Sequence, residues 1–253
     1  MRSDMQAIYV MWLRQVKRFI RAKSRLVGNL FQPLLFLAAF GFGFRGARFT
    51  GIPTTVSYLE FLAPGMVVMS VIFSSMFAGI SVLWDRQFGF LKEVLVAPVR
   101  RISIVIGKTL GGSTIALIQG FIILAASVAM GVRVSALGVV ACIFLMILVA
   151  FSSVGFGLAF ASRMEDVHGF SLIMNLLIMP AMFLSTAFFP LQGIPEAFKL
   201  VIYANPVTYE VDAVRQVLIG VGYIPLWADI LVTLGVTCLT IFAGAYLFSK
   251  CEA

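Results

Sequence analysis

Six long apolar stretches constrain the fold of this chain more than any other feature of its sequence. About 20 apolar residues in a helix cross the hydrocarbon core of a bilayer, and each of these stretches reaches that length. A transmembrane barrel would instead show alternating segments of roughly ten residues. The sequence therefore predicts an all-α membrane protein with six transmembrane helices, at about residues 26–46, 58–84, 102–131, 135–161, 169–189 and 225–249.

The composition excludes the soluble classes of protein. Apolar residues make up 61% of the 253 positions and charged residues only 12%, whereas soluble domains are near half apolar and a quarter charged. A net charge of +8 would suggest nucleic acid as the partner of a soluble protein. In a membrane protein it indicates instead which side of the membrane each loop occupies. No nucleic-acid partner is expected. Six spans use most of the length, so residues 1–253 are predicted to form a single transmembrane domain.

Residues 1–25 are typical of an amphipathic helix that lies at the cytoplasmic membrane interface. Its apolar side would face acyl chains while its arginines meet anionic lipid headgroups. Packing on the protein's own cytoplasmic face is an alternative that does not exclude the first. The apolar side holds Met5, Ile8, Tyr9, Trp12, Leu13, Val16, Phe19 and Ile20, and the polar side holds Gln6, Arg14, Gln15, Lys17, Arg18 and Arg21.

The distribution of basic residues predicts the orientation. With both termini on one side, that side receives most of the 19 lysines and arginines. The positive-inside rule then places both termini in the cytoplasm of a multi-pass protein of the cell membrane. The opposite side receives only Arg45, Arg48, Arg133, Lys199 and Arg215.

The segment 190–224 differs from the spans because prolines interrupt it and its apolar pieces are too short to cross a bilayer. We expect short helices that dip into the outer leaflet, since non-helical backbone at that depth needs cover from protein or water. Within it, Asp212 and Arg215 lie three residues apart on one helical face. They are predicted to form a structural ion pair rather than a substrate contact.

The sequence shows no catalytic or metal site. Gly107-Lys108-Thr109 resembles the end of a phosphate-binding loop, but Ile102 stands where that loop needs glycine, so no nucleotide site is expected. Gly107 and Gly111 instead suit close packing of two helices. Ionisable residues are rare within the spans, which argues against an intramembrane enzyme and against an ion-coupled carrier. Energy for transport is therefore expected from another subunit.

Residues 85–101 predict a short cytoplasmic helix between the second and third spans. Leu91, Val94 and Leu95 fall on one helical face, and Pro98 ends the turn. Such a helix can bind a groove on a partner protein. A bare connector is the alternative.

Three blocks of this sequence resemble the ABC-2 class of ABC transporter permeases. Residues 89–98, GFLKEVLVAP, are similar to its signature GTLEELLVTP, although Phe90 and Lys92 depart from the usual threonine and glutamate. Residues 58–65, YLEFLAPG, resemble the opening of its second span. Residues 205–215, NPVTYEVDAVR, resemble the run before its last span. The blocks follow the family order over nearly the whole chain, and the drug and Nod-factor export branch is the most similar.

The resemblance implies the architecture of a type V exporter and a set of partners. It implies six spans, an interfacial N-terminal helix, re-entrant helices before span six, a second permease copy in a homodimer, and two separate ATPase subunits that bind ATP and Mg. This chain would bind no cofactor itself. The resemblance assigns coupling to the ATPase to Arg86, Gly89, Leu91, Lys92, Glu93, Leu95 and Pro98, and the re-entrant segment to Asn205, Pro206, Tyr209, Asp212 and Arg215.

The expected function is export of an amphipathic, drug-like or lipid-linked molecule from the cytoplasm or the inner leaflet. Export of a polysaccharide or another glycoconjugate is the first alternative. A membrane assembly factor without transport is a more remote one, and it would require a cluster of ionisable residues within the spans.

Overall fold

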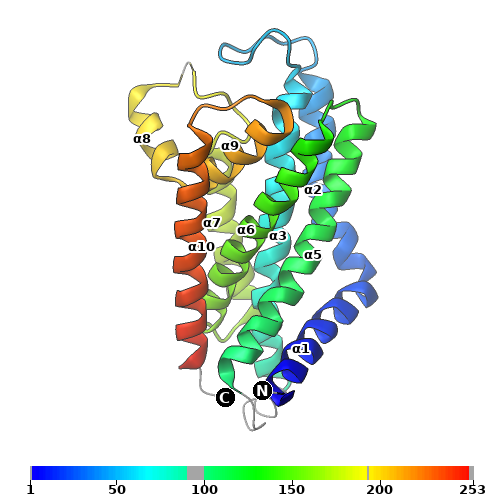
Figure 1. Ribbon diagram of the computed structural model, residues 1–253, viewed down its shortest axis with the longest axis vertical. Helices are drawn as coiled ribbons and strands as arrows, with labels where there is room; N and C mark the ends of the chain where they lie inside the picture. The colour runs from blue at the N-terminus through cyan, green and yellow to red at the C-terminus, as the bar shows by residue number, and fades with distance from the viewer. Residues whose placement is uncertain (1, 90–99, 193, 251–253) are drawn as a thin grey trace.

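A computed structural model describes residues 2–89, 100–192 and 194–250 (Figure 1). These ranges contain helices and no strand, which confirms the predicted all-α class. The helices are α1 (Arg2–Arg21), α2 (Lys23–Gly43), α3 (Tyr58–Gln87), α5 (Arg101–Ala129), α6 (Ala136–Ala161), α7 (Val167–Phe183), α8 (Glu196–Ala204), α9 (Pro206–Ile219) and α10 (Leu226–Ser249).

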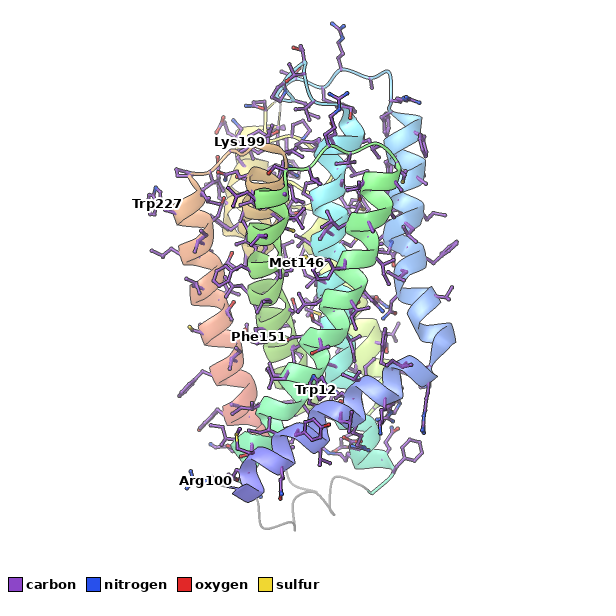
Figure 2. All side chains as sticks on the ribbon, turned by 45° about the vertical axis from the view of Figure 1, so that its right-hand side comes forward. Trp12, Arg100, Met146, Phe151, Lys199 and Trp227 are labelled. Atoms are coloured by element: carbon purple, nitrogen blue, oxygen red, sulfur yellow. The ribbon has the colours of Figure 1, made fainter. Side chains whose placement is uncertain are left out.

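Within the described residues, four helices are long and apolar enough to cross a membrane, namely α3, α5, α6 and α10. Two shorter apolar helices, Val27–Gly43 within α2 and Val167–Phe183, run beside them in the same bundle (Figure 1). The chain is therefore a helical membrane protein. Trp12 and Trp227 lie toward opposite ends of the bundle (Figure 2), as expected of residues at the two membrane interfaces.

The start of α1, the start of α5 and the end of α10 meet at one end of the bundle, which we call the terminal end. The backbone N–H of Arg100 donates to Asp4 Oδ1 at 3.2 Å, and this hydrogen bond holds the pKa of Asp4 below its ordinary value. The Arg101 side chain donates to the carbonyl of Ser249. The opposite end, where α2 is joined to α3 and α9 to α10, is called the far end (Figure 1).

Helix α3 is the centre of the bundle. Its most apolar window is completely buried, as expected for a helix that is apolar on all sides. A capping box starts the helix, since Ser57 Oγ accepts from Glu60 N at 3.2 Å and the Glu60 carboxylate accepts from Ser57 N at 2.8 Å. Both donors would otherwise lack an intrahelical partner.

Gly107 and Gly111 allow α1 to pack closely across α5, which confirms the prediction from their spacing. A Cβ atom at Gly107 would lie 2.7 Å from Met11 Cβ, and one at Gly111 would lie 2.6 Å from Gln15 Cβ. Trp12 adds a hydrogen bond from its indole Nε1 to Thr114 Oγ1 at 3.1 Å (Figure 2). Helix α1 is thus fixed to the transmembrane bundle.

Replacing Gly107 by leucine should displace α1 from α5, because overpacking a tight contact costs about 1–3 kcal/mol. Limited trypsin digestion of the purified protein should then cleave after Arg14 and Lys17 faster than in the wild type. Gly235→Leu is the matched control, since nothing lies within 4 Å of a Cβ at that exposed glycine of α10. Equal cleavage rates in the two variants would contradict the close packing.

Candidate functional site

Helix α1 packs on the protein through residues from both of its predicted sides, the apolar Phe19 and the polar Gln15. Gln15 is buried and its Nε2 donates to Ser81 Oγ of α3 at 3.1 Å. The apolar residues Met5, Tyr9 and Ile20 are exposed, as expected for a side that contacts acyl chains. Packing on the protein's own face, the alternative left open by the sequence, therefore applies to α1, and Gln15 and Phe19 show that both predicted sides contribute to it.

Four charged residues from three helices meet at the terminal end, and we call them the Asp85 cluster. Asp85 Oδ2 lies 2.6 Å from Lys108 Nζ, and both side chains are only 2% exposed. Asp85 Oδ1 lies 2.7 Å from Arg14 Nη2 and 3.6 Å from Arg18 Nη1. Burying a charge is costly unless it is paired, so this contact stabilises one arrangement of α1, α3 and α5.

The Asp85 cluster is adjacent to the predicted coupling segment. Asp85 lies two residues before the end of α3, and α5 starts at Arg101, so residues 88–100 connect two helices of the cluster. Of the predicted coupling residues, Arg86 and Gly89 are described. Leu91, Lys92, Glu93, Leu95 and Pro98 lie outside the described residues, and their predicted role stays a prediction.

The end of α3 also contacts the turn between α6 and α7. Arg86 Nη1 donates to the carbonyl of Met164 at 3.0 Å. Asp166 caps α7 by accepting from Gly169 N at 2.6 Å and from His168 N at 3.1 Å. These backbone hydrogen bonds hold the pKa of the exposed Asp166 carboxyl below its ordinary value. A movement of residues 88–100 would therefore reach α7 as well as α1.

At the far end, α7 ends at Phe183, so the predicted continuous span to residue 189 was wrong. Residues 184–190, the 184–190 segment, are not helical although they are mostly apolar. Asn205 Nδ2 donates to the carbonyls of Ala181 at 2.6 Å and Leu184 at 3.2 Å. Tyr58 Oη donates to the carbonyl of Phe188 at 2.8 Å. These side chains satisfy backbone groups that could not remain unpaired within a membrane.

Two of the sequence blocks thus converge on the 184–190 segment. Tyr58 and Gly65 come from the first block, and a Cβ atom at Gly65 would lie 2.9 Å from the carbonyl oxygen of Ala187. Asn205 and Arg215 come from the last block, and Arg215 donates to the carbonyl of Thr186. Spacing within each block did not predict this common contact.

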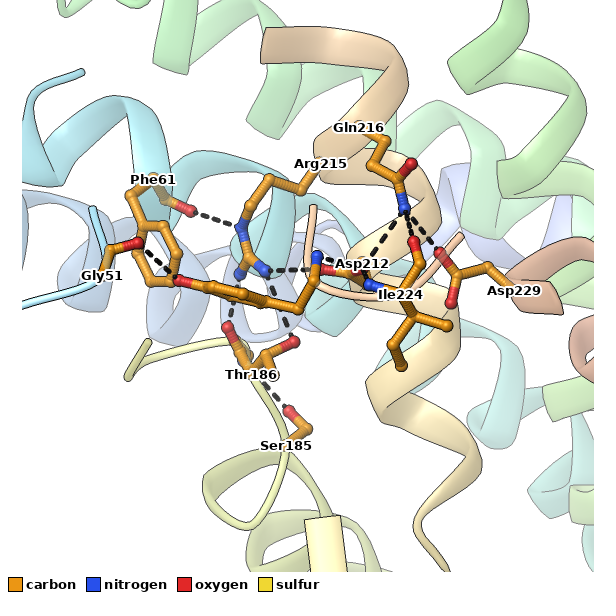
Figure 3. A network of polar contacts seen from close by, with 11 residues as sticks. Gly51, Phe61, Ser185, Thr186, Asp212, Arg215, Gln216, Ile224 and Asp229 are labelled. Carbon is orange, nitrogen blue, oxygen red and sulfur yellow. Dashed lines mark hydrogen bonds and ion pairs between the residues drawn. The ribbon is translucent and has the colours of Figure 1, made fainter. Parts of the chain in front are cut away.

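Arg215 lies at the centre of a buried polar network, which we call the Arg215 cluster (Figure 3). Its side chain is 0% exposed, and its Nη1 lies 3.4 Å from Asp212 Oδ1, which confirms the predicted ion pair. Its Nε donates to the carbonyl of Phe61 at 3.3 Å and its guanidinium lies over the Phe61 ring, 4.0 Å from the centroid. The cluster therefore joins α3, the 184–190 segment and α9.

The same network continues to the start of α10. Gln216 Nε2 donates to Asp229 Oδ2 at 2.8 Å and to Asp212 Oδ2 at 3.2 Å. Asp212 Oδ2 also accepts from the backbone N–H groups of Tyr223 and Ile224, at 2.8 and 2.9 Å. Asp229 is buried, and its Oδ1 has no hydrogen-bond partner among the described residues. The sequence offered no signal that Gln216 and Asp229 belong to this site.

The remaining predicted residues of the re-entrant segment shape its two short helices. Asn205 caps α9 by accepting from Val207 N at 3.1 Å, and Pro206 occupies the first turn, where its missing N–H is not needed. Tyr209 Oη donates to the carbonyl of Tyr203 at 2.8 Å, which ties α9 to α8. All five predicted residues therefore stabilise the structure of residues 190–224, as helix caps, hydrogen-bonding groups or members of an ion pair.

A cavity of about 240 Å³ lies beneath the first turns of α9. The buried Glu210 contributes to its wall, and Ser152 Oγ of α6 donates to Glu210 Oε1 at 2.8 Å. Glu210 does not belong to a predicted span, but the short helix α9 places it beside Ser152, well inside α6. The lining residues are Ile72, Met76, Ser152, Ser153, Phe156, Leu177, Ile178, Ala181, Asn205, Pro206, Val207, Glu210, Val236 and Thr240.

Within the described ranges, no group of three or more metal-ligating side chains is present, and the polar residues instead join helix ends to one another. The fold and these contacts define a helical membrane protein. The chain belongs to the ABC-2 type transporter family, which it matches over residues 6–219. The resemblance seen in the three sequence blocks is thereby confirmed.

Three relatives match this chain over most of their own length. The chain is 31% identical to the "Putative transport permease ycf38" of Cyanophora paradoxa over 206 residues, 79% of this chain and 71% of the relative. It is 28% identical to the "Inner membrane transport permease YadH" of Escherichia coli K12, over 87% of this chain and 86% of the relative. It is also 28% identical to "Nodulation protein J" of Rhizobium leguminosarum bv. trifolii, over 94% and 87%.

Proposed function

We propose that this chain is the permease subunit of an ATP-driven exporter, with α2, α3, α5, α6, α7 and α10 as its six spans. The terminal end faces the cytoplasm, α1 lies at the inner membrane interface, and α8 and α9 re-enter from the outer side. Membership of the family and the apolar helices support a transport function in a membrane. Two permease copies would pair with two ATPase subunits, which bind ATP and Mg.

The observation that carries this proposal is the position of the Asp85 cluster beside residues 88–100. An ATPase subunit that moves this segment would move the end of α3 and the start of α5, because the segment connects them directly. Arg14 and Arg18 would transmit the same movement to α1 through Asp85. Packed helices that switch between two arrangements can carry such a rigid-body movement.

Helix α3 connects the two ends of the proposed mechanism. Its 30 residues span about 45 Å at 1.5 Å per residue. Asp85 lies near one end, and Phe61, which contacts Arg215, lies near the other. A displacement of α3 at the cytoplasmic side would therefore repack the Arg215 cluster and the 184–190 segment at the outer side.

The proposed substrate is an amphipathic, drug-like or lipid-linked molecule taken from the cytoplasm or inner leaflet. The mostly apolar lining of the cavity beneath α9, with a single carboxyl group, supports this class. The name of the relative Nodulation protein J keeps a glycoconjugate as the second candidate.

Reconstitution with the ATPase subunit in proteoliposomes tests the proposal. Amphipathic compounds should stimulate ATP hydrolysis by the complex, whereas soluble oligosaccharides should not. Stimulation by glycoconjugates alone would favour the second candidate. Absence of any complex with an ATPase would overturn the proposed function.

The Leu91→Ala/Glu93→Gln variant should reduce substrate-stimulated hydrolysis and transport by about tenfold, equivalent to about 1.4 kcal/mol of coupling free energy. Membrane insertion should remain normal, because neither residue lies in a predicted span. Lys199→Gln, on the exposed helix α8, is a control that should leave hydrolysis unchanged. Unchanged transport in the double variant would contradict the coupling role.

A further inference from the structure

The cavity beneath α9 is reached from the side of the bundle. Leu177 of α7 is 42% exposed and also lines the cavity. Val236 of α10, which is partly exposed, lines it on the other side. The opening therefore lies between α7 and α10. In the orientation of the proposed function, on which this inference rests, the opening faces the acyl chains of the membrane.

Glu210 gives this cavity a buried carboxyl group that has no cation partner among the described residues. Glu210 is only 4% exposed. In the part of the chain that the structure describes, its carboxyl group accepts one hydrogen bond, from the neutral hydroxyl of Ser152. Among the described residues, no lysine, arginine or histidine nitrogen lies within the 4.0 Å of an ion pair. Of the other buried acids, Asp85 and Asp212 each contact a cation, and Asp229 accepts a hydrogen bond from Gln216.

The surroundings of Glu210 make a counter-charge favourable. The polar groups nearest to it are hydroxyl and amide groups, and Asn205 already uses its Nδ2 on the carbonyls of Ala181 and Leu184. A carboxylate in such a setting has lost its hydration without gaining a cation. A ligand that carries a positively charged donor would supply both the charge and a charge-assisted hydrogen bond.

We propose that the cavity is a lateral binding site for an amphipathic amine, whose ammonium group pairs with Glu210 while its hydrocarbon chain extends between α7 and α10. A water molecule occupies about 30 Å³ of liquid, so 240 Å³ holds about eight non-hydrogen atoms. This volume fits the head and first part of an alkylamine rather than a bulky polycyclic molecule. The rest of the chain would remain in the opening, in contact with lipid.

Photolabelling of the full-length permease in nanodiscs, without the ATPase, tests this site. The probe is a long-chain primary alkylamine that carries a diazirine, and labelled peptides are identified by mass spectrometry. Peptides from α6, α7 or α10 should be labelled. Decylamine should compete with the probe, whereas decanol, which has the same chain length and no charge, should compete about 10- to 100-fold less well.

Glu210→Gln should reduce labelling by a similar factor, because glutamine keeps the volume and the acceptor for Ser152 but removes the charge. Glu196→Gln is the matched control on the exposed helix α8, and it should label like the wild type. Ala181→Phe is a second variant, which keeps Glu210 but fills the cavity, and it should also lose labelling. Thermal unfolding verifies that each variant is folded.

Three results of the competition and variant experiments would overturn the inference. They are equal competition by decanol, wild-type labelling in Glu210→Gln, and wild-type labelling in Ala181→Phe. The absence of labelling in the wild type would overturn it as well. Because no ATPase is present, failure of the amine site is distinguished from failure of the proposed ATP-driven export, which the proteoliposome assay measures separately.

Discussion

Replacing Asp85 by asparagine should destabilise the purified permease by about 3–5 kcal/mol, because Lys108 would remain buried without a counter-charge. Among the residues that the structure describes, Lys108 Nζ contacts the Ser81 hydroxyl at 3.4 Å as its one polar partner besides Asp85. Lys108→Met should cost less, since Asp85 would keep Arg14 at 2.7 Å. The measurement is the midpoint of thermal unfolding in detergent, with ATPase stimulation as a second readout.

The double variant Asp85→Leu/Lys108→Met should recover most of the stability lost in Asp85→Asn. Apolar residues of similar volume often replace a buried ion pair at little cost, and Arg14 and Arg18, which are 34% exposed, can turn toward water or headgroups. Glu165→Gln, at an exposed position, is the control for loss of a carboxylate. If the double variant were less stable than Asp85→Asn, Lys108 would not depend on Asp85 for its charge balance.

The double variant should recover stability without recovering the coupling between the ATPase subunit and the membrane helices. The double variant lacks the carboxylate that connects α1 with α3 and α5, so movement of residues 88–100 would no longer reach α1. We therefore expect normal unfolding and reduced substrate-stimulated hydrolysis in the same protein. Normal stability together with reduced hydrolysis would show that the Asp85 cluster transmits movement between the ATPase and α1, and does not only stabilise the fold.

The sequence was sufficient to predict the helical membrane class and the family, because long apolar stretches and contiguous motifs are local properties of a chain. It also predicted the Asp212–Arg215 pair and the close packing at Gly107 and Gly111, since both depend on spacing within one helix. These features need no knowledge of which helices are neighbours in the bundle.

The contacts between distant segments could not be predicted in the same way. Asp85 and Lys108 were both assigned to the cytoplasmic side, but nothing in the sequence paired them or brought Arg14 to the same carboxylate. Residues 184–190 are mostly apolar and follow directly on an apolar helix, and hydropathy does not distinguish a helix from a buried coil. What allows the coil is a set of donors, Tyr58, Asn205 and Arg215, that lie far from it in the sequence.

Replacing Arg215 by methionine should have the largest effect at the far end, with a loss of about 3–5 kcal/mol in the free energy of unfolding, because Asp212 would stay buried without its cation. Methionine also removes the donors to the carbonyls of Phe61 and Thr186, so the 184–190 segment would lose its contact with α9. Thermal unfolding of the purified protein and protease cleavage within residues 184–190 measure the two effects.

Arg215→Lys should be only a partial replacement, which separates the geometry of the guanidinium from its charge. Lysine would keep a positive charge near Asp212, but its single ammonium cannot reach Phe61, Thr186 and Asp212 in the directions that the planar guanidinium serves. We expect a stability between those of the wild type and Arg215→Met, together with a clear loss of substrate-stimulated hydrolysis. Arg133→Lys and Arg133→Met, at an exposed position between α5 and α6, are the matched controls.

The variant Arg215→Met/Asp212→Asn tests whether the charge balance or the donors dominate. Asparagine can still accept from the backbone N–H groups of Tyr223 and Ile224, and it removes the carboxylate that Arg215→Met leaves without a cation. Recovery of most of the stability would show that uncompensated charge causes the loss. No recovery would assign the loss to the carbonyls of Phe61 and Thr186. In that case Arg215 would serve the far end mainly as the hydrogen-bond donor that keeps the 184–190 segment non-helical and attached to α3.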